Sequence, residues 1–289
     1  MSAALDAGLR AALEGFAAGR EALAAGFSAT PLAGGISNRS WRVGSAAGDW
    51  VLRLAGSSDA RLAVNRVAER QAQAAAAALG FAPAVVHAAP AQGVLVSEFL
   101  PGSALTRAEL ESSATLSALG ARLAELHSHP PPRGVRRLDL HAVLAHYLEL
   151  APLAAGPVSR PLLGARLRWA VASYAPVASA LCHNDLHHRN ILAAERLMFV
   201  DWEYAGVGDP LFELAAVIGY HDLDANQRAT LLAAHGGPFT SAQLASMSLT
   251  FDCLHALWLD AANGWQALAE DRRQALLARL AIDPAERQR

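Results

Sequence analysis

The segment from Leu181 to Pro210 carries polar residues whose types and spacing could transfer a phosphoryl group. His183 and Asp185 are followed by Asn190, and Asp201 ends an apolar run. The amide oxygen of Asn190 and the carboxylate of Asp201 suit a hard cation such as Mg²⁺ better than Zn²⁺. Asp185 would lie beside that metal as a carboxylate free to receive a proton from a hydroxyl. These are the parts of a kinase-type phosphoryl-transfer site.

The residues between Asn190 and Asp201 suggest how the two proposed metal ligands could meet. The sequence ILAAERLMFVD contains two short apolar runs that flank Glu195 and Arg196. This pattern predicts a β-hairpin. The hairpin would place Asn190 before its first strand and Asp201 at the end of its second.

The histidines of this segment allow two interpretations. His183, His187 and His188 could form a transition-metal cluster, but the i,i+4 spacing of His183 and His187 requires a helix, and the residues between them fit a loop. No carboxylate or cysteine completes a zinc-type spacing nearby. We therefore expect His183 to act in the catalytic segment as a brace for the loop through hydrogen bonds. Arg189 could face phosphate or solvent, and the sequence leaves both open.

The segment resembles the catalytic loop and metal-binding segment of the aminoglycoside phosphotransferase and choline kinase superfamily. The run DWEYAG (residues 201–206), with GDP at 208–210 and ELA at 213–215, is especially similar to bacterial thiamine kinases and choline/ethanolamine kinases. The resemblance implies an α+β, two-lobed, protein-kinase-like fold. Residues 1–98 would form a small N-lobe with an antiparallel sheet, and residues 99–289 a larger, mostly helical C-lobe. It also implies ATP and Mg²⁺, and it makes Asp209 and Glu213 scaffold residues.

A predicted hairpin near the N-terminus would hold the nucleotide in such a fold. SWRV and DWVLRL are β-type runs joined by the small-residue turn Gly44–Gly48. Gly34 and Gly35, with Asn38, come at the start of this hairpin. Glycines there let backbone N–H groups approach phosphates where a Cβ would obstruct them. Taken alone, a Gly-Gly pair is more often an ordinary turn.

Arginine must replace the lysine of the kinase scheme, because all 24 basic residues of the chain are arginine. Arg53, in the run VLRL, is the candidate, and the groups resembled often carry arginine at that place. A guanidinium can grip phosphate with two hydrogen bonds. Glu69, on the helix that follows, is its candidate partner. The alternatives are a solvated arginine at a strand end and a glutamate on a helix surface.

The run VLVSEFLPG resembles the hinge between the two lobes. There an adenine would meet backbone N–H and C=O groups of Glu98, Phe99 and Leu100. Pro101 and Gly102 end the predicted strand and begin a loop.

The acceptor pocket must come mainly from the helical C-terminal part, residues 211–282. Trp258 and Trp265 are seven residues apart and would share a face of one helix. Trp202 and Tyr204 follow the metal aspartate, and two further acids, Asp252 and Asp260, lie nearby in sequence. Aromatic faces and carboxylates bind organic cations. The same tryptophans could equally be core residues.

Several functions remain open at this point. A small-molecule alcohol kinase is favoured, with thiamine as the leading acceptor, choline or ethanolamine next, and a sugar or amino sugar third. Acidic residues are too scattered to suggest a polycationic drug. The rival from another class is a nucleotide-binding regulator without catalysis, but Asp185, Asn190 and Asp201 are all present. ATP or GTP use and oligomeric state are not predicted.

Composition limits the partners and the location of the chain. A 289-residue chain with 53% hydrophobic and 17% charged residues can form real cores. A net charge of −2 gives no electrostatic case for nucleic acid or an acidic membrane. Glycine and prolines interrupt the uncharged stretch 71–97, so it is not a membrane span. The N-terminus predicts an amphipathic helix rather than a signal peptide, and Cys182 and Cys253 are isolated thiols. We expect a cytoplasmic protein.

Overall fold

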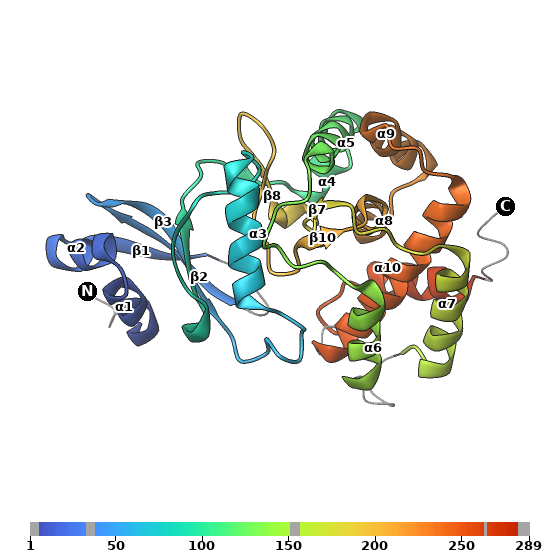
Figure 1. Cartoon of the computed structure of the whole chain (residues 1–289), viewed down its shortest axis with the longest axis horizontal. Coiled ribbons are helices and arrows are strands. Elements are labelled where there is room, and N and C mark those ends of the chain that lie inside the picture. The colour runs from blue at the N-terminus through green and yellow to red at the C-terminus, as the bar shows by residue number, and fades with distance from the viewer. Residues whose placement is uncertain (1–5, 33–37, 151–156, 263–264, 283–289) are drawn as a thin grey trace.

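The structure is a computed structural model that describes residues 6–32, 38–150, 157–262 and 265–282. It has two lobes, one built on a sheet and one mostly helical (Figure 1). The sheet lobe contains α1 (Ala7–Glu14), α2 (Ala17–Ala25), β1 (Phe27–Leu32), β2 (Asn38–Ser45), β3 (Gly48–Ala55), α3 (Arg66–Ala78), β4 (Val85–Ala89), η1 (Pro90–Gln92) and β5 (Val94–Glu98). The strands form one antiparallel sheet in the order β1-β2-β3-β5-β4.

Strand β3 shows why this sheet can serve both a core and a site. Side chains alternate between the two faces of a strand. Trp50 and Leu52 are buried in a cluster with residues of α1, whereas Val51 and Arg53 lie on the opposite face and line the cavity between the lobes. The predicted hairpin is therefore confirmed as β2–β3. The sequence missed the edge strand β1 and the second helix, α2.

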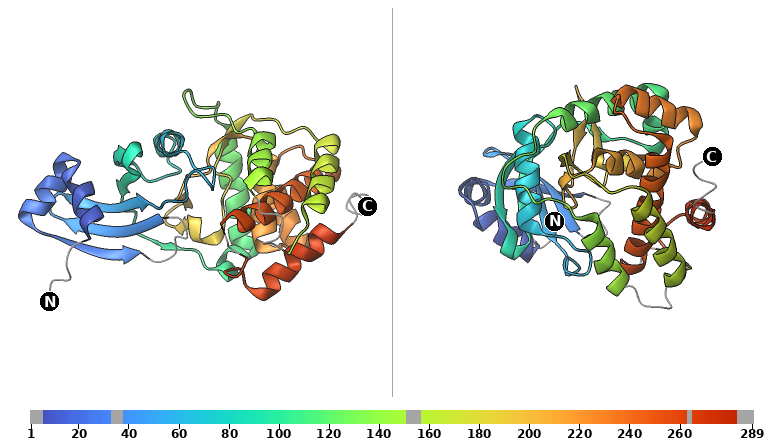
Figure 2. Two further views of the ribbon diagram at one scale, coloured as in Figure 1. Left: turned by 90° about the horizontal axis from the view of Figure 1, so that it is seen from below. Right: turned by 45° about the vertical axis from the view of Figure 1, so that its right-hand side comes forward.

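The helical lobe begins with β6 (Ser103–Ala104). It continues with α4 (Arg107–Leu110), α5 (Ser113–Ser128), α6 (Leu140–Leu150), α7 (Arg160–Ser173), β7 (Ala180–Cys182), η2 (His188–Asn190), β8 (Ile191–Ala193), β9 (Met198–Phe199), β10 (Gly206–Gly208), α8 (Pro210–His221), α9 (Ala225–His235), α10 (Ser241–Ala261) and α11 (Glu270–Ala281). One face of α5 is buried in the main core through Leu116, Leu119, Leu123 and Leu126. The helices of this lobe lie at the opposite end of the molecule from α1 and α2 of the sheet lobe (Figure 2).

Short strands carry the catalytic segment along the inner side of this lobe. β8 pairs antiparallel with β9, with Ile191 opposite Phe199 and Leu192 opposite Met198. Asn190 immediately precedes β8, and Asp201 follows β9 by two residues. The hairpin predicted between these two residues is confirmed. β6, just after the connection between the lobes, pairs with the outer edge of β8.

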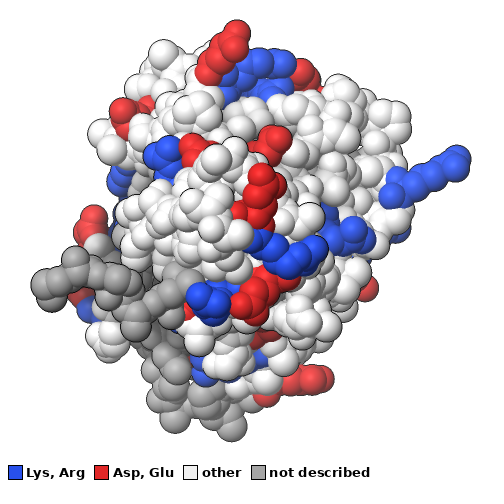
Figure 3. All heavy atoms as spheres, turned by 90° about the vertical axis from the view of Figure 1, so that its left-hand side faces the viewer, with Lys and Arg blue, Asp and Glu red and all other residues white. Residues whose placement is uncertain are grey.

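The surface agrees with the modest net charge. On the face of the sheet lobe shown in Figure 3, basic and acidic side chains are interspersed. Within the described residues, no helix has both the length and the apolar character needed to cross a membrane.

We expect Gly120→Ala to lower the free energy of unfolding by about 1–3 kcal/mol, the usual range for overpacking a core. A Cβ at Gly120, on α5, would lie 2.5 Å from the carbonyl oxygen of Leu231, on α9. Two helix backbones would then have to separate. Gly164→Ala, on α7, is the matched control because its Cβ would meet only the end of the Arg168 side chain. It should be neutral or stabilising, since alanine favours a helix.

Urea titration measures both variants. Equal stability of Gly120→Ala and Gly164→Ala would contradict the close packing of α5 on α9.

Candidate active site

A cavity of about 900 Å³ separates the two lobes, and most of the predicted site residues line it. Its wall includes Arg53 and Glu69 from the sheet lobe, and Asp185, Asn190 and Asp201 from the helical lobe. These residues come from four separate parts of the sequence. The fold thus brings to one cavity the residues that the sequence predicted separately as phosphate-binding, metal-binding and catalytic.

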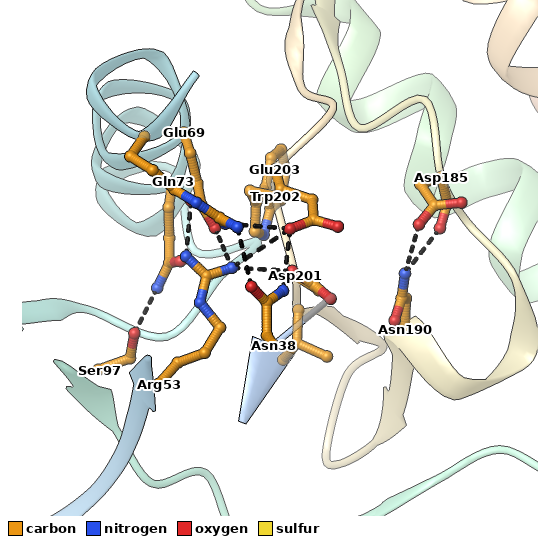
Figure 4. A network of polar contacts seen from close by, with 12 residues as sticks. Asn38, Arg53, Glu69, Gln73, Ser97, Asp185, Asn190, Asp201, Trp202 and Glu203 are labelled. Carbon is orange, nitrogen blue, oxygen red and sulfur yellow. Dashed lines mark hydrogen bonds and ion pairs between the residues drawn. The ribbon is translucent and has the colours of Figure 1, made fainter. Parts of the chain in front are cut away.

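Asp185 is held by two side chains. Tyr220 Oη, at the end of α8, donates to Asp185 Oδ1 at 2.6 Å. Asn190 Nδ2 donates to Asp185 Oδ2 at 3.2 Å and to its backbone oxygen at 2.9 Å. The Nδ2 of Asn190 is therefore committed to Asp185, which leaves its Oδ1 as the atom that could bind a cation. Figure 4 shows Asp185 and Asn190 joined in this way.

Two residues beside the reacting groups have left-handed backbones. Asn184 has φ +66° and Asp201 has φ +64°. Such conformations cost about 1–3 kcal/mol for residues other than glycine and persist where the surroundings enforce them. The Nδ2 of Asn184 donates to the carbonyl oxygen of Tyr204 at 3.2 Å. Asparagine and aspartate tolerate this region better than most residues, which suits both positions.

His183 braces the loop from inside. Its Nε2–H donates to the carbonyl oxygen of Val200 at 2.8 Å, and its Nδ1 accepts the N–H of Asp185 at 3.3 Å. The ring is buried, and burial lowers the pKa of His183. These contacts favour a neutral ring that ties the catalytic loop to the end of the β8–β9 hairpin. Among the described residues, His183, His187 and His188 do not belong to any group of side chains close enough to bind one metal ion. The structure therefore does not support the histidine metal cluster.

Glu213, on α8, holds the catalytic loop through its backbone. Glu213 Oε1 accepts the N–H of His183 at 2.6 Å and the N–H of Asn184 at 2.9 Å. Asp209 caps the same helix, because its Oδ1 accepts the N–H of Leu211 at 2.8 Å. Both residues therefore act in the scaffold, but Glu213 touches the strained turn directly.

Arg53 lies on the cavity wall in a cluster of acids. Arg53 Nη2 donates to Glu69 Oε2 at 2.6 Å, and Nη1 to Asp201 Oδ1 at 3.2 Å. Burial opposes the charge on Arg53, but Glu69 and Asp201 outweigh it and raise its pKa. The predicted pairing of Arg53 with Glu69 is present, and the strand-end arginine is buried rather than solvated.

Sequence reasoning missed a second arginine in this cluster. Arg66 Nη1 donates to Glu69 and to Glu203 Oε2, each at 3.0 Å, and Nη2 donates to Asn38 Oδ1 at 2.8 Å. Asn38 Nδ2 also donates to Glu203 Oε2 at 2.9 Å (Figure 4). In the sequence, Glu203 stands out only as part of the DWEYAG run. The one available signal was its i+2 spacing from Asp201.

The donor set suits a divalent cation with oxygen ligands. Carboxylate oxygens of Glu69, Asp201 and Glu203 lie within 4.8 Å of one another. Burial raises the pKa of Asp201 to about 6, and burial with the neighbouring Asp201 raises that of Glu203 to about 7. Packed acids with raised pKa values gain from a nearby positive charge. Asp201, one of the two metal ligands predicted from the sequence, belongs to this group. The other, Asn190, lies on the wall of the same cavity.

The hinge offers fewer backbone groups than the sequence suggested. The N–H of Glu98 already donates to Ala84 O at 2.9 Å, and the N–H of Phe99 to Asp49 O at 3.0 Å. Among the described residues, the N–H of Leu100 has no backbone acceptor. Leu100 is therefore the hinge residue whose N–H could meet an adenine. All three side chains line the cavity. Gly34 and Gly35 lie outside the described residues, so only Asn38 represents the glycine-rich start of the hairpin.

Comparison with known proteins identifies the family and supports the fold. The model of the phosphotransferase enzyme family matches residues 28–247. This chain belongs to that family. A solved choline/ethanolamine kinase family protein from Mesorhizobium loti is similar over 96% of both chains, with 26% identity and a TM-score of 0.73. A structure of LicA in complex with AMP is similar over 88% of this chain and 93% of its own, with 19% identity and a TM-score of 0.71.

Curated relatives match this phosphotransferase family member over shorter stretches. Thiamine kinase from Shigella boydii is 34% identical over 43% of this chain, and streptomycin 6-kinase from Streptomyces griseus is 34% identical over 42%. These matches span 42% and 40% of the relatives, and the match to Haemophilus influenzae LicA spans 14% of that protein. The resemblance and the kinase-like fold expected from the sequence are both confirmed.

Part of the wall of the phosphotransferase cavity is aromatic. Tyr204, Tyr220 and Trp258 line it, and Trp258 Nε1 donates to Tyr204 Oη at 2.9 Å. His255 also lines the cavity, and its buried Nδ1 has no hydrogen-bond partner among the described residues. Asp252 is not open to a ligand, because Arg279 Nε donates to it at 2.8 Å.

Two of the tryptophans proposed as acceptor contacts are core residues. Trp202 is 0% exposed, and its Nε1 donates to Phe199 O at 2.9 Å within the main core. Trp265 is 7% exposed and packs in a second core cluster. It does not share a helix with Trp258, because α10 ends at Ala261. Neither side chain lines the cavity.

Arg53→Ala should raise the KM for ATP by about 10- to 100-fold, because the variant loses a charge-assisted hydrogen bond to phosphate. Arg66 still neutralises Glu69 in this variant, so the protein should fold. Arg39→Ala is the control, since Arg39 is an exposed arginine of the same sheet that pairs with Asp6. An unchanged KM for ATP in Arg53→Ala would remove its assigned role.

Proposed function

We propose that this protein transfers the γ-phosphoryl group of ATP to the hydroxyl of a small alcohol in an Mg²⁺-dependent reaction. The observation that carries the proposal is the convergence of Asp185, Asn190 and Asp201 on one cavity that also holds the Arg53–Glu69 pair. The complex of the related LicA with AMP supports a nucleotide in that cavity. A reaction that consumes ATP is compatible with a cytoplasmic enzyme.

The side chains would divide the work by position. The N–H of Leu100 would donate a hydrogen bond to the adenine, and the Arg53 guanidinium would bind phosphate oxygens. The Asp185 carboxylate, fixed by Tyr220 and Asn190, would orient the acceptor hydroxyl and receive its proton. Burial raises the pKa of Asp185 to about 6, so the group is mostly ionised at neutral pH while remaining a competent proton acceptor. Bound Mg²⁺ would neutralise the negative charge of the phosphates.

Thiamine is the leading acceptor, and choline or ethanolamine the next. Tyr204, Tyr220 and Trp258 line the cavity that also contains Asp185, and aromatic rings are a common binding surface for an organic cation. The relation to thiamine kinase over part of the chain agrees with this choice. The acids Asp252 and Asp260 do not serve it. Asp252 is bound by Arg279, and Asp260 does not line the cavity.

A sugar or amino sugar is the second candidate. His255 Nδ1 is a buried atom at the cavity wall that has no hydrogen-bond partner in the described part of the chain, and an acceptor hydroxyl could satisfy it. The partial match to streptomycin 6-kinase points the same way.

An acceptor screen coupled to ADP release separates these candidates. It should cover thiamine, choline, ethanolamine and amino sugars, each with and without Mg²⁺. Turnover confined to sugars would remove the aromatic-cation argument. If the protein binds ATP with Mg²⁺ but phosphorylates no hydroxyl compound, and Asp185→Asn changes nothing, it is a nucleotide-binding regulator.

A further inference from the structure

Glu213, which holds the catalytic loop, is the first member of a chain of hydrogen bonds that includes two histidines. His127, near the end of α5, contacts Glu213 Oε2 through Nε2 at 2.7 Å. His127 Nδ1 contacts His235 Nε2, at the end of α9, at 3.0 Å. The N–H of Gly237 donates to His235 Nδ1 at 3.2 Å. Neither histidine lines the cavity. We refer to His127 and His235 as the histidine pair.

The backbone of Gly237 determines the protonation of both rings. Because His235 Nδ1 accepts an N–H, the proton of the neutral ring must be on Nε2. That Nε2–H can only donate to His127 Nδ1, so the proton of His127 must also be on Nε2. His127 Nε2–H then donates to Glu213. All three bonds thus run in one direction, from Gly237 towards the carboxylate, without a clash of two donors or two acceptors.

The pKa values agree with this assignment. Burial lowers the pKa of His235 to about 4, which keeps the ring neutral at physiological pH. Burial raises the pKa of Glu213, but the hydrogen bond from His127 and the backbone hydrogen bond from Asn184 act against it, and the pKa stays below its ordinary value. Glu213 is therefore an ionised acceptor with both oxygens occupied, Oε1 by two backbone amides and Oε2 by His127.

Helix packing explains why the two rings can meet. α5 and α9 approach each other at Gly120, where even one Cβ would come within 3.1 Å of the His235 backbone nitrogen. The ring centroids of His127 and His235 are 5.2 Å apart. Cys182 Sγ lies 3.8 Å from His127 Nε2 and completes the surroundings of that atom. The pair is thus built into the contact between two helices.

We propose that His127 and His235 are positioning residues that orient the Glu213 carboxylate and, through it, the backbone of His183 and Asn184 next to Asp185. The inference rests on the proposed function for its kinetic consequence, but not for its structural one. A rotated Glu213 would release one of the two amides that hold the left-handed turn at Asn184. Asp185 would then be less well aligned while the nucleotide site stays intact.

The tautomers can be measured without any acceptor. We expect ¹⁵N NMR of histidine-labelled protein at neutral pH to show both rings as neutral Nε2–H tautomers. The variants His127→Gln and His235→Gln assign the signals. An Nδ1-protonated or doubly protonated ring at either position would overturn the proposal, whatever the enzyme phosphorylates.

Hydrogen exchange and kinetics test the consequence. In His127→Ala, the amides of His183 and Asn184 should exchange faster while those of α10 keep their rates. The kcat should fall by about 10- to 100-fold, as for loss of a hydrogen bond to a charged group. The KM for ATP should stay within about twofold. His127→Gln should recover most of the kcat, because its Nε2–H can still reach Glu213.

His141→Ala is the control, since His141 is an exposed histidine of the same lobe, and it should match the wild type in both measurements. Unchanged exchange at residues 183–184 in His127→Ala, or an equal loss of kcat in His127→Gln and His127→Ala, would contradict a positioning role. If no acceptor is found, the exchange and NMR results still decide the structural claim.

Discussion

Asp185→Asn should lower kcat by about 10²- to 10⁴-fold, the usual contribution of a positioned proton acceptor. The amide has the shape of the carboxylate and can still accept the hydrogen bond from Tyr220 through its oxygen. It loses the side-chain bond from Asn190, which keeps its bond to the backbone oxygen of residue 185. It cannot take a proton from the acceptor hydroxyl, so the KM for ATP should change little. The loss would therefore appear in the chemical step.

Steady-state kinetics with an identified acceptor checks this expectation. Glu149→Gln is the matched control, because Glu149 is an exposed acid on α6 and the substitution is the same in kind. Wild-type kcat in Asp185→Asn would mean that Asp185 neither orients nor deprotonates the hydroxyl. A rise confined to the acceptor KM would reduce its role to binding.

Asp201→Ala should abolish Mg²⁺-dependent turnover, with a loss of about 10³-fold or more, because a metal supplies several kcal/mol of charge stabilisation. Asp201→Asn keeps one oxygen and tolerates the φ of +64° at this position. It should retain some activity and need a higher Mg²⁺ concentration. We therefore expect kcat to fall from the wild type to Asp201→Asn and further to Asp201→Ala, and Asp201→Asn to need more Mg²⁺ than the wild type.

Stability separates loss of the metal from loss of the fold. Burial raises the pKa of Asp201 to about 6 even though Arg53 is adjacent, so the ionised side chain is not a source of stability in the metal-free protein. The Tm of Asp201→Asn without Mg²⁺ should therefore equal or exceed that of the wild type, and circular dichroism should be unchanged. Stabilisation by Mg²⁺ should be present in the wild type and lost in Asp201→Ala. Equal Mg²⁺ stabilisation of both would refute the metal assignment.

The sequence predicts the site best where neighbouring residues determine the geometry. Asn190 and Asp201 lie at the two ends of one hairpin, and the two apolar runs that predict this hairpin are a local pattern. Arg53 and Glu69 were matched through the resemblance to kinases, and their contact is present. The division of the chain between residues 98 and 99 remains a prediction, although the connection between the lobes does lie near β5 and β6.

The missed contacts depend on distant parts of the chain. Tyr220 reaches Asp185 across 35 residues, and Arg66 reaches Glu203 across 137. No spacing rule relates such pairs, since each depends on how α8 or α3 packs against the catalytic segment. The error at Trp265 has a different origin. The seven-residue spacing of Trp258 and Trp265 places them on one face only if both lie in the same helix. Because α10 ends at Ala261, Trp265 packs into a core cluster instead of lining the cavity.

Arg66 has a consequence for how substrates enter. Its guanidinium binds Asn38, Asp59 and Glu69 on the sheet lobe and Glu203 on the helical lobe. Swinging the two lobes apart would strip a buried charge of one partner, which is costly. The nucleotide could enter in two ways. Either the lobes separate and the bond from Arg66 to Glu203 breaks, or the lobes stay linked and the nucleotide enters through the open side of the cavity. In the first case, the cost of breaking that bond would limit the rate of entry.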